Sequence, residues 1–452
     1  MGLDGPRHPN WMCCMGRPAP IRAMAGLHAA LAMIQGLPSM VSAQRNILFL
    51  IADQHRHDAM GDGAHTPHLD ALAADGAQFL THYSSTPSCT PARAAILTGR
   101  SPWHHGMLGY GSVAPTYPRE LPAEMLAAGH RTFVVGKDHF GWNDANGTPV
   151  THGYENPQIY DGLGSGLVNG TSFDDYDRWF QEQRPGEDPL KSGGLNWNTW
   201  RGASYEYEEY LHPTAWTGRH AVERLRSFAA EGTPFFLKVS FHRPHSPYDP
   251  PERILAGVRT PGRGPARAVD GWDEQRRACE NHGKPDQCCG EVDEASLDLA
   301  RRAYLGGLAF VDEQIGEILR VLRETGLSEN TFILYTSDHG DMQNDHYLWR
   351  KAQPYEGSTH VPLVVWWPRA MEGEIRARRG AKVRDVTELR DILPTFLDVL
   401  GRWDGAAQAH FDGRPLTHLL RGGPPAQSWR GWVDLEHNVY CSPRYHWSAL
   451  TD

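Results

Sequence analysis

NILFLIAD, residues 46–53, is an uninterrupted apolar run of strand length that ends at a carboxylate. Continuous apolar runs of this kind suit strands buried on both faces, as in a parallel sheet covered by helices. Four more runs share this character: Thr132–Val135, Phe235–Phe241, Phe332–Ser337 and Val361–Trp367. The chain therefore predicts several buried strands, with Asp53 at the end of the first.

Amphipathic segments alternate with these runs along the chain. Thr66–Phe79, Leu299–Thr325 and Thr387–Leu400 carry apolar residues at helical spacing. Strands that alternate with helices are typical of α/β folds. We therefore expect an α/β fold with a mostly parallel central sheet flanked by helices on both faces. Gly257–Gly290 is rich in Gly, Pro and charge, and we interpret it as a long surface insertion.

The composition of the 452 residues excludes several classes of protein. Hydrophobic residues make up 40%, which is enough to build a core and argues against global disorder. The net charge of −10 argues against a nucleic-acid partner, which normally requires a basic surface. No stretch reaches the roughly 18 apolar residues of a membrane span, so we expect none.

The N-terminal residues have the character of a targeting segment. Arg17 and Arg22 precede the apolar run Ala23–Leu37, and Val41-Ser42-Ala43 supplies small residues suited to cleavage. We expect residues 1–43 to be a signal peptide or leader, with an organellar transit segment or a misassigned start as alternatives. The protein would then be secreted or reside in an endomembrane or lysosome-like compartment. Sequons at Asn146 and Asn169 fit this extracytoplasmic route.

Polar residues stand where four of the predicted strands end. They are Asp53, Lys137 with His139, His245, and Asp338 with His339. In open α/β sheets, ligands bind beyond the carboxyl ends of the parallel strands, so these side chains are expected to share one site. Two carboxylates suit a hard divalent cation, imidazoles suit proton transfer, and a lysine suits an anion.

Cys89 is expected to lie close to a helix N-terminus. It begins the sequence Cys-Thr-Pro-Ala-Arg93, and Pro91 with the following Ala-Ile-Leu run indicates the first turn of a helix. A helix N-terminus favours an anion. Taken alone, such a cysteine is either a reactive thiol or a core residue.

The segment Cys89–Arg93 resembles the C-x-P-x-R signature of the formylglycine-dependent sulfatases of the alkaline phosphatase superfamily. Further segments are similar to motifs of this family, in the family's own order across roughly residues 45–400. They are Asn46–Gln54, Thr66–Ala73, Gly136–His139, Pro244–Pro247, Ser337–Asp341 and Lys351–Pro362. The resemblance implies an arylsulfatase-like enzyme, a sulfuric ester hydrolase that cleaves a sulfate monoester of a carbohydrate or aryl alcohol.

The resemblance also implies a role for each matched residue. A formylglycine-generating enzyme would convert Cys89 to formylglycine (3-oxoalanine), whose hydrate attacks sulfur. Arg93 and Lys137 would hold this hydrate, Lys351 and His245 would contact the sulfate and assist the leaving group, and His139 would remove a proton. A divalent ion, Ca²⁺ in most members, would be bound by Asp53, Gln54, Asp338 and His339, and would touch residue 89.

Three residues depart from the commonest family pattern. Gln54 and His339 stand where many members have Asp and Asn, and an imidazole suits Mn²⁺ or Zn²⁺ better than Ca²⁺. Asp138 replaces a frequent aromatic residue. Gln54 and His339 keep open a phosphonate monoester or phosphodiester hydrolase of the same superfamily. A non-catalytic binder of sulfated glycans, with Cys89 unconverted, is the other alternative.

The same resemblance divides the chain into parts. Residues 44–400 would form the catalytic domain, and residues 401–452 would form the start of a C-terminal subdomain, which we expect to be truncated. Outside the leader, Cys89 is accompanied by four cysteines with three possible pairings. They are Cys279, Cys288, Cys289 and Cys441. A bridge between the adjacent Cys288 and Cys289 is the least expected pairing.

Several residues near the motifs have weaker interpretations. Trp142, Trp197 and Trp200 are expected to pack in the core, with stacking on sugar rings as the alternative. The acidic cluster Asp174, Asp175 and Asp177 is expected to be a solvated segment. Six polar residues beside the motifs are candidates either to face substrate or to lie behind the site. They are His104, His105, His242, Asp345, His346 and Arg350.

Overall fold

The computed structural model describes most of the chain from Arg45 onward. The described residues are 45–61, 65–141, 149–162, 167–168, 171–172, 174–260, 284, 287–422, 429–438 and 446–451, all within one compact unit, Gln44–Asp452. The expected leader 1–43, the sequon asparagines Asn146 and Asn169, Trp142, Cys279 and Cys441 lie outside the described residues.

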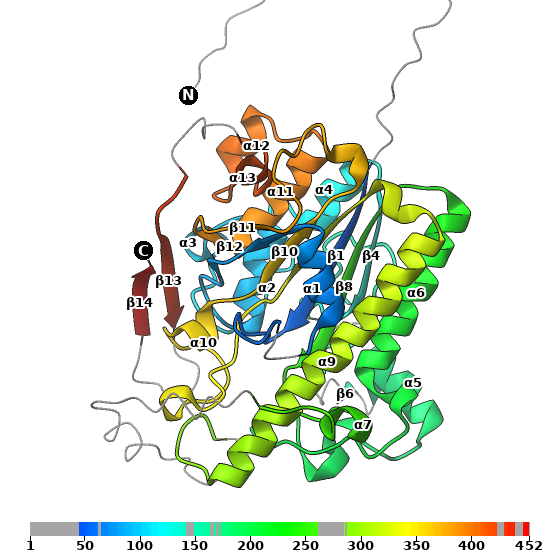
Figure 1. The fold of residues 1–452 in the computed structure, drawn as a ribbon, viewed down its shortest axis with the longest axis vertical. Helices are drawn as coiled ribbons and strands as arrows, with labels where there is room; N and C mark the ends of the chain where they lie inside the picture. Colours follow the sequence, from blue (N-terminus) through cyan, green and yellow to red (C-terminus); the bar gives the residue numbers. More distant parts are fainter. Residues whose placement is uncertain are drawn as a thin grey trace, which may run out of the picture. The chain divides into compact units, whose positions relative to one another are not determined.

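An eight-stranded sheet forms the centre of this unit (Figure 1). Its strand order is β11 (Ala381–Val383), β2 (Ala77–Phe79), β10 (Leu363–Trp366), β9 (Thr331–Thr336), β1 (Asn46–Asp53), β8 (Phe235–Pro244), β4 (Arg131–Gly136) and β5 (Gln158–Ile159). β10 runs antiparallel to both of its neighbours, and the other paired strands of the sheet are parallel. The predicted mostly parallel sheet is confirmed.

Alternate residues of β1 belong to two different hydrophobic cores. Ile47, Phe49 and Ile51 pack in one core with the helix α11 (Ile392–Val399), while Leu48 and Leu50 pack in the other with α6 (Pro213–Glu231). The first core also includes residues of α2 (Cys89–Thr98) and α4 (Leu121–Ala127); the second includes residues of α1 (Pro67–Ala74) and α9 (Glu294–Glu324). Helices therefore cover both faces of the sheet, as the uninterrupted apolar runs predict.

Shorter elements complete the described chain. The helices are α3 (Pro102–His105), α5 (Asp175–Gln183), α7 (Glu252–Leu255), α10 (Glu356–Thr359), α12 (Gly405–His410) and α13 (Thr417–Leu420). The remaining strands pair in twos: β12 (Thr387–Glu388) with β3 (His82–Tyr83), β13 (Val433–Asn438) with β14 (His446–Thr451), and β6 (Leu167–Val168) with β7 (Thr171–Ser172). In the described part of the chain, no helix has the length and apolar character needed to cross a bilayer.

Two of the predicted helices are wrong in extent. The helix expected over Thr66–Phe79 ends at Ala74, and residues 77–79 form β2 instead. Gly76 makes this change of direction possible, because a Cβ there would lie 2.3 Å from the carbonyl oxygen of Val365 in β10. The helix expected over Thr387–Leu400 begins only at Ile392, since residues 387–388 pair with β3. The strand expected over 361–367 exists as β10, but it runs against its neighbours.

The burial of His82 predicts a pH-dependent stability. Burial lowers the pKa of His82 to about 3, its Nδ1 lies 2.9 Å from Thr387 Oγ1, and its Nε2 has no partner among the described residues. Because the unfolded chain binds this proton near pH 6.5 and the folded chain does not, stability falls as the pH drops below 6.5. We expect His82 to contribute a loss of about 2 kcal/mol between pH 6.5 and about pH 5.

Urea unfolding of the His82→Gln variant at several pH values measures this contribution. The variant should show a shallower decrease of unfolding free energy with falling pH than the unaltered chain does. His65→Asn, a change at an exposed histidine, should leave the slope unchanged. Equal slopes for His82→Gln and the unaltered chain would show that His82 does not titrate as its burial requires.

Candidate active site

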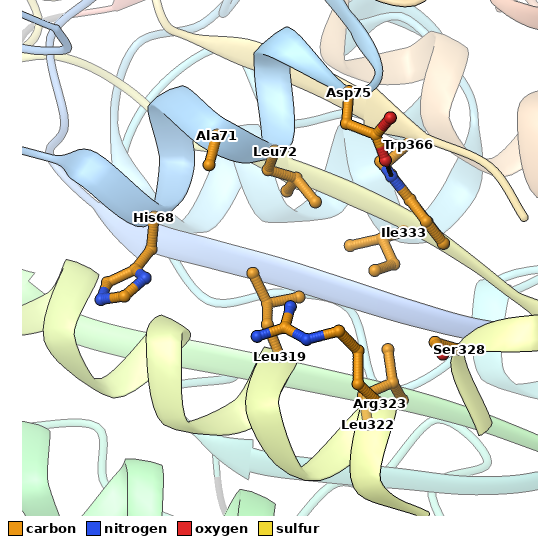
Figure 2. Close-up of a pocket in the computed structure, with 10 residues that line it drawn as sticks. All are labelled: His68, Ala71, Leu72, Asp75, Leu319, Leu322, Arg323, Ser328, Ile333 and Trp366. Carbon is orange, nitrogen blue, oxygen red and sulfur yellow. Dashed lines mark hydrogen bonds between the residues drawn. The ribbon is translucent and has the colours of Figure 1, made fainter. Parts of the chain in front are cut away.

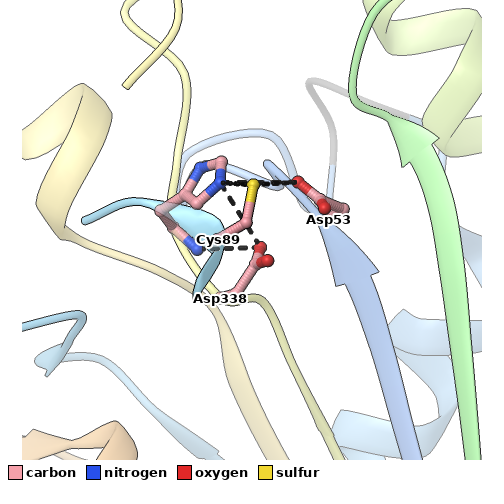
Figure 3. A group of neighbouring side chains, drawn as sticks. Asp53, Cys89 and Asp338 are labelled. Atoms are coloured by element: carbon pink, nitrogen blue, oxygen red, sulfur yellow. Dashed lines mark hydrogen bonds and ion pairs between the residues drawn. The ribbon is translucent and has the colours of Figure 1, made fainter. Parts of the chain in front are cut away.

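Three of the predicted strand-end residues, Asp53, Lys137 and His339, surround the thiol of Cys89, the first residue of α2. The Sγ atom lies 3.3 Å from His339 Nε2, 3.0 Å from Lys351 Nζ, 3.8 Å from Lys137 Nζ and 4.0 Å from Asp53 Oδ1. Figure 3 shows Asp53 and Asp338 approaching the cysteine from the ends of two neighbouring strands. All of these side chains are buried.

Two cations bind the two carboxylates directly. Lys137 Nζ lies 2.6 Å from Asp53 Oδ2, and Arg93 contacts the same oxygen at 3.3 Å and Asp338 Oδ2 at 2.9 Å. Arg93 Nη1 also donates to the Lys137 carbonyl oxygen at 2.8 Å and to Ser240 Oγ at 3.1 Å. With Lys351, three cations surround two carboxylates, so the site carries a surplus of positive charge suited to an anion.

This surplus shifts the acidity of the buried groups. Burial and the Asp53 carboxylate act to raise the pKa of the Cys89 thiol, but the charges of Lys137 and Lys351 bring that pKa well below its ordinary value. Burial likewise raises the pKa of Asp53, yet the charge of Lys137, with a smaller effect of Lys351, holds it well below its ordinary range. The site therefore stabilises negative charge at position 89.

Four side chains form a donor set for a divalent cation. One ligand atom from each of Asp53, Cys89, Asp338 and His339 lies within 4.8 Å of the others. His339 Nδ1 lies 2.9 Å from the Gly340 carbonyl oxygen, so Nδ1 carries the proton and the Nε2 lone pair faces the site. Carboxylate oxygens and an imidazole in this arrangement fit a divalent metal ion.

Asp341, to which the sequence analysis assigns no role, holds Gln54 against this donor set. The Gln54 backbone N–H donates to Asp338 Oδ1 at 3.2 Å, and its Nε2 donates to Asp341 Oδ2 at 2.6 Å. The amide oxygen is thereby directed into the site, 3.4 Å from Lys351 Nζ. Asp341 also accepts from Tyr248 Oη at 2.5 Å. Asp341 lies only three residues after Asp338, and this short spacing was the feature of the sequence that could have placed it near the site.

His245 lies beside the cluster as a neutral imidazole. Its backbone N–H donates to the Asp53 carbonyl oxygen at 3.0 Å, and its Nδ1 lies 2.8 Å from the Ser246 carbonyl oxygen. Burial, followed by the charge of Lys351, lowers its pKa well below the ordinary value. His245 can therefore accept a hydrogen bond at neutral pH without adding another cation.

His139 is buried at the same end of the sheet but makes no described hydrogen bond to the Cys89 cluster. Its backbone N–H donates to Asp161 Oδ1 at 2.9 Å, and Nε2 lies 3.3 Å from Tyr110 Oη. Nδ1 is buried and has no partner among the described residues. The structure thus adds Tyr110, 45% exposed, and Asp161 to the surroundings of the site. Neither was singled out from the sequence.

The strand β13 holds the segment that precedes Cys89. His437 Nε2 lies 2.8 Å from Ser88 Oγ, and both side chains are buried. The backbone N–H of Glu436 donates to the Ser85 carbonyl oxygen at 2.9 Å, and that of Asn438 donates to Leu108 at 2.5 Å. Residues expected to belong to a separate subdomain therefore position the start of α2. No sequence signal pointed to His437, which is 349 residues away from Ser88.

The other candidate residues separate into surface and buried groups. His104 is exposed and pairs with Asp412, while His105 and Arg350 are buried. His242 packs against His245 with ring centroids 4.9 Å apart. Two further candidates lie close to the site segments without touching Cys89: Asp345 pairs with Arg56 and Arg301, and the His346 ring contacts Tyr355.

Two of the weaker sequence interpretations are wrong. Asp174 is buried and not solvated, because its Oδ2 accepts the backbone N–H groups of Asp161 and Gly162 at 3.0 and 3.2 Å. Trp197 is 38% exposed and does not pack in the core. Trp200 does pack in the core, where it stacks on Trp349 at a centroid distance of 5.2 Å.

Three of the cysteines outside the expected leader are described. Cys288 and Cys289 are both disulfide-bonded, and Cys89 is the free cysteine of the described part of the chain. The partners expected for the pair, Cys279 and Cys441, lie outside the described residues.

A separate hollow of about 300 Å³ lies away from the Cys89 cluster, between α1, α9 and the sheet (Figure 2). Leu72, Leu319 and Ile333 are among its apolar lining residues. At its edge Trp366 Nε1 donates to Asp75 Oδ2 at 2.7 Å. The hollow shares no residue with the candidate active site.

Comparison with known proteins identifies the family to which this fold and site belong. The family model described as sulfatase matches residues 45–402. An arylsulfatase of Clostridium perfringens is 36% identical over 413 residues, covering 87% of this chain and 81% of the relative. A choline-sulfatase of Rhizobium meliloti is 28% identical, covering 85% of this chain and 73% of the relative.

A solved structure shows the same fold. The phosphonate monoester hydrolase of Silicibacter pomeroyi matches with a TM-score of 0.70 and 27% identity, covering 87% of this chain and 80% of the other. The chain belongs to the sulfatase family, and it is a sulfuric ester hydrolase of the alkaline phosphatase superfamily.

The contact between Asp341 and Gln54 predicts an indirect effect on metal binding. The change Asp341→Asn removes one acceptor and places an N–H group where Gln54 or Tyr248 now donates. We expect metal affinity to fall about 10- to 100-fold, as for other residues that orient a metal ligand. Metal titration by calorimetry measures the change.

A reciprocal variant serves as the control. When Gln54→Glu is added to Asp341→Asn, the amide N–H at position 341 can donate to the carboxylate at position 54. This restores a hydrogen bond between the two side chains, so part of the metal affinity should return. Unchanged affinity in Asp341→Asn would show that Gln54 is not a ligand or needs no orientation.

Proposed function

We propose that the chain hydrolyses a sulfate monoester of an aryl alcohol or carbohydrate by means of a formylglycine residue at position 89. The observation that supports this most directly is the burial of Cys89 at the start of α2, within 4.0 Å of Lys351, His339, Lys137 and Asp53. Conversion by a formylglycine-generating enzyme would replace the thiol with an aldehyde. Its hydrate supplies both a nucleophilic oxygen and a route for releasing sulfate.

The side chains around position 89 have roles that follow from their contacts. Arg93 and Lys137 are fixed by Asp53 and Asp338, so they present positive charge beside the reacting oxygen without moving. Lys351 faces position 89 from the loop before α10 and is placed to bind a sulfate oxygen. Help to the leaving group is assigned to His245, which would have to bind a proton in the complex with the anionic ester before donating it.

His139 is the residue assigned to proton removal. Its buried Nδ1 without a described partner leaves one nitrogen available as a base, while the contact with Tyr110 fixes the ring through Nε2. A general base needs to lie within hydrogen-bond reach of the proton that it removes. The hydrate of residue 89 would have to place its second hydroxyl within such reach of His139 Nδ1.

A divalent ion would be held by Asp53, Gln54, Asp338 and His339, in contact with residue 89. It supplies positive charge at the reacting oxygens. The family precedent favours Ca²⁺, whereas the imidazole of His339 also suits Mn²⁺ or Zn²⁺.

A phosphonate monoester hydrolase activity is the second candidate. It is favoured by Gln54 and His339 and by the structural similarity to the phosphonate monoester hydrolase. Lys137 and His139 favour the sulfatase. A non-catalytic glycan binder is the least favoured alternative, because binding alone does not require a buried thiol with a lowered pKa.

We also propose that the chain matures in an extracytoplasmic compartment and consists of a leader, a catalytic domain and the start of a C-terminal subdomain. The disulfide-bonded state of Cys288 and Cys289 supports maturation in an oxidising, extracytoplasmic compartment, consistent with a leader at 1–43. The family model match supports a catalytic domain over residues 44–400. The pairing of β13 with β14 supports a distinct element within residues 401–452.

Hydrolysis rates with two chromogenic substrates test the function. We expect kcat/KM for nitrophenyl sulfate to exceed that for nitrophenyl phenylphosphonate, because Lys137 and His139 match the sulfatase motif. The Cys89→Ala variant should lose both activities, which controls for a contaminating hydrolase. A preference for the phosphonate would assign the second candidate function, and no Cys89-dependent hydrolysis of either ester would contradict the proposal.

A further inference from the structure

A second group of donor side chains lies apart from the Cys89 cluster. His57 follows β1, Glu356 begins α10, and His360 directly follows that helix. One ligand atom from each lies within 4.8 Å of the other two. The imidazole rings of His57 and His360 stack with centroids 3.8 Å apart, and His360 Nδ1 lies 2.5 Å from Glu356 Oε2. This group shares no side chain with the proposed active site.

His57 has an unused nitrogen lone pair or N–H group. Its Nδ1 is buried and has no hydrogen-bond partner among the described residues. Burial, followed by the neighbouring His360, lowers the pKa of His57 to about 4, so the ring is neutral at pH 7. A neutral imidazole is the form that binds a metal ion, and a buried nitrogen without a partner is unfavourable unless something binds it.

The backbone keeps the three residues together. The His57 N–H donates to the His360 carbonyl oxygen at 3.2 Å, and Glu356 and His360 are four residues apart across one helical turn. Tyr83 Oη donates to Glu356 Oε1 at 3.1 Å, so the Oε2 atom is the one directed toward His360. The Glu356 side chain is 58% exposed, which leaves the carboxylate able to move and solvent able to reach the group.

We propose that His57, Glu356 and His360 form a second metal site that binds Zn²⁺, with a fourth position open to water. Two imidazoles and one carboxylate are a common zinc ligand set, and imidazoles favour Zn²⁺ over Ca²⁺ and Mg²⁺. Bonds of about 2.0–2.1 Å require ligand atoms roughly 3.4 Å apart, so the group contracts on binding. The stacked rings turn apart about their side-chain torsions so that both lone pairs point at the ion.

Zinc at this position would join two segments of the active site. His57 lies three residues after Gln54, and Glu356 lies five residues after Lys351. An ion bound to both segments would restrain them without touching the reacting atoms. The ion would bind to these three side chains whether or not the chain hydrolyses sulfate esters.

Zinc content after equilibrium dialysis of the full chain tests the site. We expect the unaltered chain to bind one more Zn²⁺ per chain than His57→Gln or His360→Gln, and the same difference should persist when Asp338→Asn is introduced to disable the first cluster. Glu356→Gln changes an exposed side chain and should fold normally, and it should weaken zinc binding at least tenfold. His104→Gln, which removes an imidazole paired with only one carboxylate, should leave the zinc content unchanged.

Two results would overturn the site. One is an equal zinc content in the unaltered chain and in folded His57→Gln and His360→Gln chains. The other is unchanged zinc affinity in Glu356→Gln, which decides the question if the histidine variants fail to fold. Because zinc alone is the probe, both results are independent of sulfatase activity.

Discussion

The site depends on the ion pairs that join Arg93 and Lys137 to Asp53 and Asp338. All four side chains are at most 1% exposed, so water does not screen or solvate these charges. Removing one partner of a buried ion pair costs about 3–5 kcal/mol, because the other charge is left uncompensated. The network therefore fixes the ends of β1, β4 and β9 against the first turn of α2. This arrangement determines where residue 89 can lie.

The same network explains why the site suits an anionic ester. Lys351 brings a third cation to Cys89, so positive charges outnumber the two carboxylates. Gln54 places a neutral amide where many members of the family have a further carboxylate, which would cancel part of that surplus. A divalent ion raises the positive charge further, and a sulfate ester supplies the compensating negative charge. Binding of metal and substrate is thus expected to be mutually favourable on electrostatic grounds.

Much of this arrangement could be predicted from the sequence because strand ends in a parallel sheet share one edge. The runs before Asp53, Lys137, His245 and Asp338 are mostly apolar, which indicates strands buried on both faces. The residues that bring Cys89 to the same edge are local, since Pro91 and the following apolar residues begin a helix there.

The remaining contacts depend on tertiary structure and carried no local signal. His437 reaches Ser88 only because β13 crosses the start of α2. A glycine is needed at position 76, just after α1, because a Cβ there would clash with the carbonyl oxygen of Val365. Val365 lies almost 290 residues further along the chain. Asp174 looks like part of a solvated acidic cluster, yet it is buried because it accepts two backbone N–H groups. Sequence spacing alone does not distinguish such partners from solvent.

The mass of the peptide that contains residue 89, measured in a catalytically active preparation of the full chain, tests the central claim most directly. Conversion of Cys89 to formylglycine predicts a peptide mass about 18 Da below that of the thiol form. A fully active preparation in which residue 89 is entirely unmodified cysteine would contradict the account.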